Sequence, residues 1–468
     1  MFLQKDGFPR WEQVTEGKTK AIYEVRDRRD LAIAEYKPAI TAYDDPKLTQ
    51  AFGTKAADSC AVTCRLFEML QKAGLPVAYL GQLSATEFVA PLLKMASVEL
   101  ITRRRVHPKG SIRKRRPELP AYHRFPELTF EVCLKTNDGG KYTNINGEEI
   151  DLQLIEEGKP VDDPLVLDPF AEEWQLIGKT SITTPTILAT IKRDDVVRGV
   201  DDIKEYRRLL HMAFLVIEGI CRMLDWNEFD IKVECGTLLE DFHMVDGTVI
   251  PAGTIMIGDV LDPDSWRVIN EKGKEYSKQA FRDMILSGEI DLDEVARIYR
   301  AVAEAISGFH VREQALVLWR GSDKDSWPTT VLDGPMGVLD LEKVPGVAIE
   351  RVTLSGHKQT KKCLVRLNEI MTKYSTGVIY AKIGMSDGLA PIIATHTTWP
   401  VLVYPATMKE HSEDVWSSLN LPSNTPVGVV GSESNTMLQA LRALAPMNPI
   451  IYAWFQYMNE QFEAQSEP

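Results

Sequence analysis

The stretches FDIKVECG, residues 229–236, and GDVLDPDSWR, residues 258–267, decide the fold. Apolar and charged residues alternate in the first stretch up to its glycine, a pattern typical of a strand with one face in a core. Lys232 and Glu234 then share a face, because side chains two positions apart in a strand point the same way. Two strands that contribute Glu234 and Asp259 can hold Mg²⁺, which prefers hard oxygen ligands. On the pattern alone, a surface hairpin with solvated charges is equally open.

The composition is that of a soluble globular protein. The chain has 468 residues, 44% of them apolar and 26% charged, which suits two or three domains. No apolar run reaches about 18 residues, so we expect no membrane span, and the mixed polar N-terminus predicts no signal peptide. Six scattered cysteines without metal-ligand spacing predict a reduced cytoplasmic protein. The net charge of −13 argues against general nucleic-acid binding, so a phosphorylated ligand needs local positive charge.

Two basic segments could supply that charge. Residues 16–20, EGKTK, precede an apolar run, and a Gly-Lys-x-Lys turn entering a strand can place Lys18 and Lys20 over a polyphosphate. The spacing is not that of a Walker P-loop, and a solvated turn is the alternative. Residues 103–116 are the densest charge in the chain. Composition alone permits a nuclear signal or a nucleic-acid patch there, but the Gly110–Ser111 pair inside the run favours an anion site for arginine forks.

Periodicity predicts the main elements. Helical spacing covers residues 56–73, with Gly74 as a C-cap, as well as residues 203–224 and 291–309. Residues 137–160 are polar and glycine-bearing, as in a hairpin excursion. Towards the C-terminus, short apolar runs alternate with helical stretches, which predicts a three-layer α/β domain with a parallel sheet. These runs are residues 314–320, 346–354, 376–383, 400–404 and 426–430.

The pattern Lys-x-Glu-x-Gly followed by Gly-Asp-x-x-x-Pro-Asp-Ser-x-Arg resembles the catalytic half of SAICAR synthetase, an ATP-dependent amide ligase of purine synthesis. The resemblance implies an α+β ATP-binding fold, with ATP and Mg²⁺ as cofactors. It places Lys18, Lys20, Met95, Glu99 and Lys232 on the nucleotide, and Glu234 and Asp259 on the metal. It places Arg104, Ser111, Asp163 and Arg267 on the substrate, with Arg105 as a rival to Arg104. Lys18, Lys20, Lys232, Asp264 and Arg267 would be the catalytic residues.

One segment departs from that family. After Ile40-Thr41-Ala42 the family continues with Gly-Asp or Gly-Asn and a later arginine, whereas this chain has Tyr43-Asp44-Asp45-Pro46-Lys47. The family shapes its substrate pocket here, so the resemblance leaves the identity of the substrate open.

Three loops at predicted strand ends resemble AIR carboxylase, in its animal form that uses CO₂ directly. They are residues 321–325, 355–358 and 384–389. The resemblance makes His357 the proton carrier. It implies substrate contacts from Ser322, Asp325, Ser355, Lys358 and Ser386, and a homo-octamer built on this domain. Lys324, Gly356, Ile383 and Asp387 depart from the family pattern. A carboxylate at position 387 would repel a substrate carboxylate by about 1 kcal/mol or more.

We therefore predict a SAICAR synthetase-like ligase domain over residues 1–285, a connecting helix over 286–312 and an AIR carboxylase-like domain over 313–468. The predicted function is purine biosynthesis. The ligase joins the carboxylate of CAIR to aspartate through an acyl phosphate, and the carboxylase makes CAIR from AIR and CO₂. The partners are small phosphorylated substrates, without nucleic acid or membrane. One alternative is a diverged paralogue that joins another acid to another amine and keeps its carboxylase domain for assembly. The other is a catalytically silent scaffold.

Overall fold

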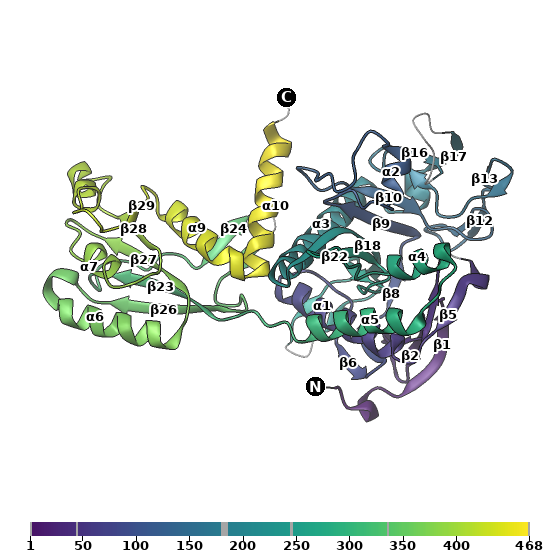
Figure 1. Ribbon diagram of the computed structural model, residues 1–468, viewed down its shortest axis with the longest axis horizontal. Coiled ribbons are helices and arrows are strands. Elements are labelled where there is room, and N and C mark those ends of the chain that lie inside the picture. Colours follow the sequence, from purple (N-terminus) through teal and green to yellow (C-terminus); the bar gives the residue numbers. More distant parts are fainter. Residues whose placement is uncertain (1, 44, 179–185, 244–246, 335–336, 467–468) are drawn as a thin grey trace. The chain divides into compact units, whose positions relative to one another are not determined.

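The chain divides into two compact units, residues 1–309 and 310–468, and each is described by itself (Figure 1). The computed structural model describes residues 2–43, 45–178, 186–243, 247–334 and 337–466. The helix predicted as a connection is α5 (Leu292–Ser307), and it lies within the first unit. There its apolar stripe, including Val295 and Tyr299, packs against Phe281 in one buried cluster. No helix of the described residues is long and apolar enough to cross a membrane.

An antiparallel sheet of five strands opens the first unit. Its order is β1 (Arg10–Glu16), β2 (Lys20–Val25), β3 (Arg28–Tyr36), β7 (Glu87–Pro91) and β6 (Gly81–Ser84). Helix α1 (Lys55–Lys72) contacts β3 and β7. It confirms the predicted helix, since Gly74 follows its C-cap with a φ of 84°, and Cys60 and Cys64 are buried in its inner face.

A larger antiparallel sheet carries the stretch that decides the fold. Its central strand is β18 (Trp226–Leu238), against which the long helix α3 (Val200–Met223) packs. The sheet order is β17 (Ile187–Lys192), β16 (Glu173–Ile177), β15 (Leu165–Val166), β10 (Glu131–Leu134), β9 (Val98–Arg103), β18 and β21 (Ile255–Gly258). Strands β22 (Trp266–Asn270) and β8 (Leu93–Met95) also pair with β18.

Strand β18 changes both neighbours along its length. Its first half pairs with β22 and β9, and its second half, from Glu234 onwards, pairs with β21 and β8. Four strands therefore end or begin around residues 232–234, and their terminal side chains gather there.

Short elements complete the first unit. The hairpins are β4 (Ala39–Thr41) with β5 (Thr49–Ala51), β11 (Lys141–Thr143) with β12 (Glu149–Asp151), β13 (Ile155–Glu156) with β14 (Lys159–Pro160), and β19 (Phe242–His243) with β20 (Val249–Ile250). The remaining helices are α2 (Ile112–Arg115) and α4 (Gln279–Ser287). The pairs β11–β12 and β13–β14 confirm the predicted hairpin excursion.

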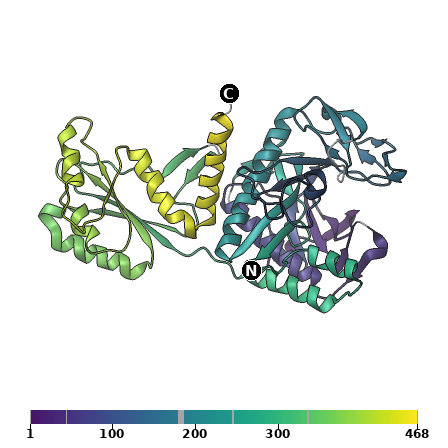
Figure 2. The same cartoon turned by 45° about the horizontal axis from the view of Figure 1, so that its top comes forward.

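The second unit is built on a parallel sheet, as predicted. Its order is β26 (Val347–Thr353), β23 (Gln314–Arg320), β27 (Gly377–Ile383), β28 (Val401–Pro405) and β29 (Gly428–Val429). Helices α6 (Gly356–Lys373) and α7 (Ala390–Ala394) share a buried cluster with one face of this sheet, and α9 (Glu433–Leu444) contacts β27 and β28 (Figure 1, Figure 2). The hairpin β24 (Val331–Gly334) and β25 (Gly337–Asp340), and helices α8 (Trp416–Leu419) and α10 (Pro449–Ser466), complete it.

Candidate active site

Where β18 changes neighbours, Glu234 and Asp259 lie beside each other, and Glu99 is linked to Glu234 through Lys232. Glu234 lies in β18 and pairs in register with Gly258, so Asp259 follows directly beside it. Asp259 has a φ of 60°, which turns the chain immediately after β21. Glu99 approaches from β9. Burial and the neighbouring Asp259 raise the pKa of Glu234, so the two carboxylates lie close enough to interact.

Each of these carboxylates is paired with a lysine. Lys232 Nζ donates to Glu99 Oε1 at 2.6 Å and lies 3.9 Å from Glu234. Lys135 Nζ donates to Glu234, and Lys20 forms an ion pair with Asp259. Burial by itself raises the pKa of Asp259, but Lys20 and Lys135 outweigh it and leave that pKa low. Lysines and carboxylates thus alternate around one point.

Lys135 is a member of this cluster that the sequence analysis missed. It directly follows β10, and it precedes the hairpin excursion. Asp163, in a turn with a φ of 50°, accepts a hydrogen bond from the Thr136 amide, so this turn fixes the backbone beside Lys135. Lys18 lies exposed in the turn between β1 and β2, two residues before Lys20.

Two glycines make room for Met95 beside the cluster. A Cβ at Gly236 would lie 2.7 Å from Leu93 Cβ and 2.9 Å from Met95 Sδ. A Cβ at Gly258 would lie 3.3 Å from the same sulfur. Met95 is 40% exposed, so it covers the ends of β18 and β21 and still offers an apolar surface to a ligand.

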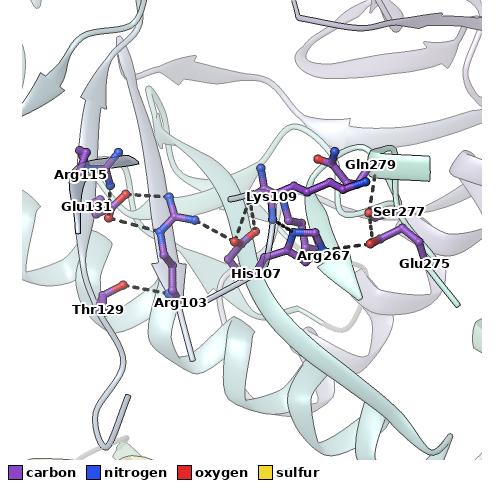
Figure 3. Close-up of polar contacts among 11 residues, drawn as sticks. Arg103, His107, Lys109, Arg115, Thr129, Glu131, Arg267, Glu275, Ser277 and Gln279 are labelled. Atoms are coloured by element: carbon purple, nitrogen blue, oxygen red, sulfur yellow. Dashed lines mark hydrogen bonds and ion pairs between the residues drawn. The ribbon is translucent and has the colours of Figure 1, made fainter. Parts of the chain in front are cut away.

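A second charged cluster surrounds Asp230, which lies two residues before Lys232 in β18. Arg103 and Arg267 flank Asp230 in register on β9 and β22, and both donate to its carboxylate, at 2.8 and 2.9 Å. Arg103 and Arg115 also donate to Glu131 (Figure 3), whose pKa falls to about 2 because these arginines outweigh its burial. The buried Nε of Arg267 has no hydrogen-bond partner among the described residues.

The arginine that shares Asp230 with Arg267 is Arg103, whereas the predicted substrate arginine is Arg104, with Arg105 as its rival. Arg104 points to the opposite face of the chain, because successive residues of a strand alternate. Its side chain is fully buried and donates to Glu218 and to the carbonyl of Pro126, both at 3.2 Å. Ser111 precedes the short helix α2 and makes no capping bond there. The proposed pair of Arg104 and Ser111 is not brought together by any of the described contacts.

Asp264 is held in a third, buried group. Tyr299 of α5 donates to its Oδ1, and Lys55 of α1 lies 3.2 Å from its Oδ2. Lys278 lies at 3.9 Å. Burial raises the pKa of Asp264, but Lys55 and Lys278 outweigh that effect and leave it low. Asp264 is thus a fixed anion.

The segment that departs from the family lies near helix α4. Tyr43 has a φ of 51°, unusual for a residue other than glycine, and is half exposed. The guanidinium of Arg282, in α4, lies 6.0 Å from the centre of its ring. Residue 44 lies outside the described residues.

In the second unit, two of the three predicted ligand loops touch through glycines. A Cβ at Gly356 would lie 2.1 Å from the carbonyl oxygen of Gly388, and a Cβ at Gly388 would lie 2.4 Å from the His357 ring. His357 therefore packs on loop 384–389. The Ser355 side chain caps α6 by accepting a hydrogen bond from the Lys358 amide. The residue Lys358 is exposed.

Asp387, which was expected near a substrate carboxylate, is hydrogen-bonded within the protein. The residue is 7% exposed. Its carboxylate accepts hydrogen bonds from Ser418 Oγ at 2.8 Å and from the amides of Leu389 and Ala390. Burial raises its pKa although these donors oppose the shift. Loop 321–325 keeps Ser322 and Lys324 exposed, and Ser386 accepts from Gly388 through its carbonyl.

Each of the two units contains a match to a known family. Residues 13–161 match the SAICAR synthetase family, and residues 332–465 match the AIR carboxylase family. The chain thus resembles SAICAR synthetase over one stretch and AIR carboxylase over another. A relative in Caenorhabditis elegans, the probable multifunctional protein ADE2, is 26% identical over 94% of this chain and 92% of its own. The bifunctional phosphoribosylaminoimidazole carboxylase/phosphoribosylaminoimidazole succinocarboxamide synthetase of Drosophila melanogaster is 26% identical over 96% and 92%.

Two solved structures show partial similarity to this chain. Phosphoribosylaminoimidazole-succinocarboxamide synthase of Ehrlichia chaffeensis has a TM-score of 0.45 at 16% identity and covers 64% of this chain and 99% of its own. Treponema denticola PurE has a TM-score of 0.26 at 17% identity and covers 33% and 94%.

In the SAICAR synthetase domain, the structure thus brings together Lys20, Glu99, Lys232, Glu234 and Asp259, with Met95 at their edge, and it holds Arg267 and Asp264 in neighbouring groups. In the AIR carboxylase domain, it brings His357 to loop 384–389. Arg103, Lys135 and Tyr299 were not among the predicted site residues.

Proposed function

We propose that the chain is a bifunctional enzyme of purine biosynthesis. The first unit joins the carboxylate of CAIR to the amine of aspartate with ATP, giving SAICAR, and the second unit carboxylates AIR to CAIR with CO₂. The observation that carries the ligase assignment is the alternation of lysines and carboxylates around Glu234 and Asp259. Such a cluster suits a polyphosphate with a divalent cation, because the lysines can bind the phosphate oxygens and the carboxylates can bind the cation.

The residues present fit a magnesium ion. Glu234 and Asp259 offer hard oxygen donors from adjoining strands, and no group of three or more ligating side chains forms among the described residues. Mg²⁺ characteristically takes one or two carboxylates and completes its shell with phosphate oxygens and water. When bound, it would neutralise charge on the transferring phosphoryl group. Lys20, Lys135 and Lys232 would then exchange their carboxylate partners for phosphate oxygens.

A carboxylate is a poor electrophile, so the ligase first has to activate it. A carboxylate oxygen of CAIR attacks the γ-phosphorus of ATP, forming an acyl phosphate and releasing ADP. The amine of aspartate then attacks the acyl carbon, loses a proton and expels inorganic phosphate. The protein mainly positions the reactants and stabilises charge, which can lower the activation barrier by roughly several kcal/mol. Arg267, which Asp230 orients and whose side chain is 18% exposed, is suited to an anionic group of the substrate.

We expect the second unit to assemble the chain into a homo-octamer, and we place the enzyme in the cytoplasm, where its six free, buried cysteines would remain reduced. The diverged paralogue stays a second candidate, because Tyr43 replaces the family's glycine at a left-handed position and stacks near Arg282. It would join a different acid to a different amine with the same cluster.

The deciding experiment supplies purified protein with ATP, Mg²⁺, CAIR and aspartate and reads the product by mass, beside an assay with AIR and bicarbonate. We expect SAICAR in the first assay and CAIR in the second. Glu234→Gln should lower the ligase kcat by about 100-fold or more, because it removes charge from the phosphoryl site. Lys204→Met, which alters an exposed pair with Asp201, is the control. Neither product, with ATP still bound, would contradict the purine assignment and point to the paralogue.

A further inference from the structure

Two cations stand side by side at the carboxyl edge of the parallel sheet. Arg320 on β23 and Lys382 on β27 are register partners, and the same row continues to Thr353 on β26 and Tyr404 on β28. Paired residues of neighbouring strands point to the same face. The side chains of Arg320 and Lys382 are only 14% and 8% exposed. Because two like charges in a buried row repel, this arrangement needs compensating partners.

Most of those partners lie in loop 321–327, which follows β23. Arg320 donates from one amino group to the carbonyl of Asp325 at 2.5 Å and from the other to Asp323 at 3.0 Å. Its guanidinium also lies 4.1 Å from the centre of the Trp327 ring. Lys382 donates to Ser326 Oγ at 2.9 Å. The loop is therefore fastened by two neighbouring strands.

Two further contacts anchor the cations themselves. Arg320 Nε donates to Thr353 Oγ1 at 2.8 Å, which fixes the plane of the guanidinium. Lys382 Nζ lies 3.3 Å from Glu433, the first residue of α9. Arg320 and Lys382 thus tie the loop to β26 and to α9 as well as to their own strands.

The fastening leaves the loop's own ligand groups available. Arg320 binds Asp325 through its main-chain oxygen, and no described contact occupies the Asp325 carboxylate. Ser322 and Lys324 are exposed, and Ser322 Oγ accepts only from the Lys324 amide. A loop that is held at its base and open at its tip is pre-organised, and it binds a ligand without first losing conformational freedom.

We propose that Arg320 and Lys382 are positioning residues of the carboxylase half: they clamp loop 321–327 so that Ser322 and Asp325 stand ready for the AIR nucleotide. The inference rests on the proposed carboxylase function. The clamp acts on substrate binding more than on the chemical step, because neither cation is placed at the reacting atoms.

The test uses the full chain with Arg320→Met and Lys382→Met. Each should raise the KM for AIR by about tenfold with kcat within about threefold, the mark of lost binding. Trypsin should cleave after Lys324 faster in both variants. Arg351→Met and Lys373→Met, which remove ion pairs with Glu342 and Glu350 in the same unit, are the controls. CAIR-to-SAICAR activity of the same samples reports that the first unit is intact.

Milder variants keep the inference open to contradiction if the methionine variants fail to fold. Ser326→Ala removes one acceptor of Lys382, and Arg320→Lys keeps the charge but loses the fork, so both should raise the KM by less than the methionine variants. An unchanged KM in all four variants would overturn the clamp, as would a raised KM with unchanged cleavage after Lys324. If the wild type ligates CAIR but does not carboxylate AIR, the carboxylase proposal fails and the clamp falls with it. A carboxylating wild type with insensitive variants defeats the clamp alone.

Discussion

At the scale of single residues, Glu228 is the exception among the buried charges of the first unit. Arg103, Asp230 and Lys55 are each paired, whereas Glu228 is 2% exposed and neither of its carboxylate oxygens has a hydrogen-bond partner among the described residues. Burial first, and then repulsion from Glu218, raise its pKa far above the usual value. Glu228 is therefore neutral in the folded protein at pH values where the unfolded chain would ionise it.

Glu228→Leu should stabilise the first unit at neutral pH. Because the folded pKa is raised, the folded state holds a proton that the unfolded state releases, so wild-type stability declines as the pH rises above the ordinary glutamate pKa. We expect the leucine variant to gain about 1–3 kcal/mol at pH 8 and less at pH 5. Urea unfolding at the two pH values measures this. Glu118→Gln, which alters an exposed pair with Arg116, should change little, and an equal gain at both pH values would contradict the explanation.

At the scale of elements, the antiparallel pairing of β18 with β8 depends on the absence of a side chain at Gly236. At Gly236 a Cβ would meet Leu93 Cβ at 2.7 Å and the Lys94 carbonyl at 3.0 Å, and neither atom is the end of a flexible side chain. At Gly258 a Cβ would meet only the ends of Met95 and Leu93, at 3.3 Å or more. The two glycines therefore differ in what a methyl group would displace.

Gly236→Ala should push β8 away from β18 and move Met95 from the cluster. We expect a loss of about 1–3 kcal/mol in the free energy of unfolding, typical of an overpacked site, together with a raised KM for ATP. Gly258→Ala should produce smaller changes, because side-chain ends can shift. Urea unfolding and ligase kinetics of both variants test the difference, and equal effects would show that the backbone contact at Gly236 is not decisive.

Helix α5 contributes a polar contact to the ligase unit as well as packing. Tyr299 donates to the buried Asp264, which Lys55 and Lys278 also hold. Tyr299→Phe should lower the free energy of unfolding by about 1–3 kcal/mol, because it leaves a buried carboxylate oxygen with one donor fewer. Tyr374→Phe, which removes a hydroxyl bonded to the more exposed Glu350, should cost less. Denaturant unfolding compares the two, and a neutral Tyr299→Phe would argue that Asp264 needs no tyrosine.

At the scale of the whole molecule, the chain forms two compact units with separate candidate sites. The Lys232 and Glu234 cluster belongs to the first unit, and His357 belongs to the second. Each unit has a buried core of its own among the described residues. The two activities should therefore be separable within one polypeptide.

His357→Asn should lower the rate of AIR carboxylation by about 100-fold or more, because it removes the proposed proton carrier. The ligase kcat should stay within about twofold of the wild-type value. Lys232→Met should do the reverse. Both assays on the same full-length samples measure this. Loss of both activities in either variant would show that the units depend on one another.

The sequence by itself determined the local structure and the chemistry within single elements. Alternation in residues 229–236 correctly predicted β18 and the shared face of Lys232 and Glu234, because a strand's period of two is a local property. The helix over 203–224 and the parallel strands of the second unit followed from the same kind of pattern.

Only the tertiary structure decided which strands lie side by side and in what register. The contact of Arg103 with Asp230 spans 127 residues of sequence, and that of Lys135 with Glu234 spans 99. Arg103 and Arg267 both meet Asp230 because β9 and β22 pair with β18 at the same residue. The clamp of Arg320 and Lys382 arises in the same way, from neighbouring strands whose alignment no local pattern encodes, since it results from packing of the whole sheet.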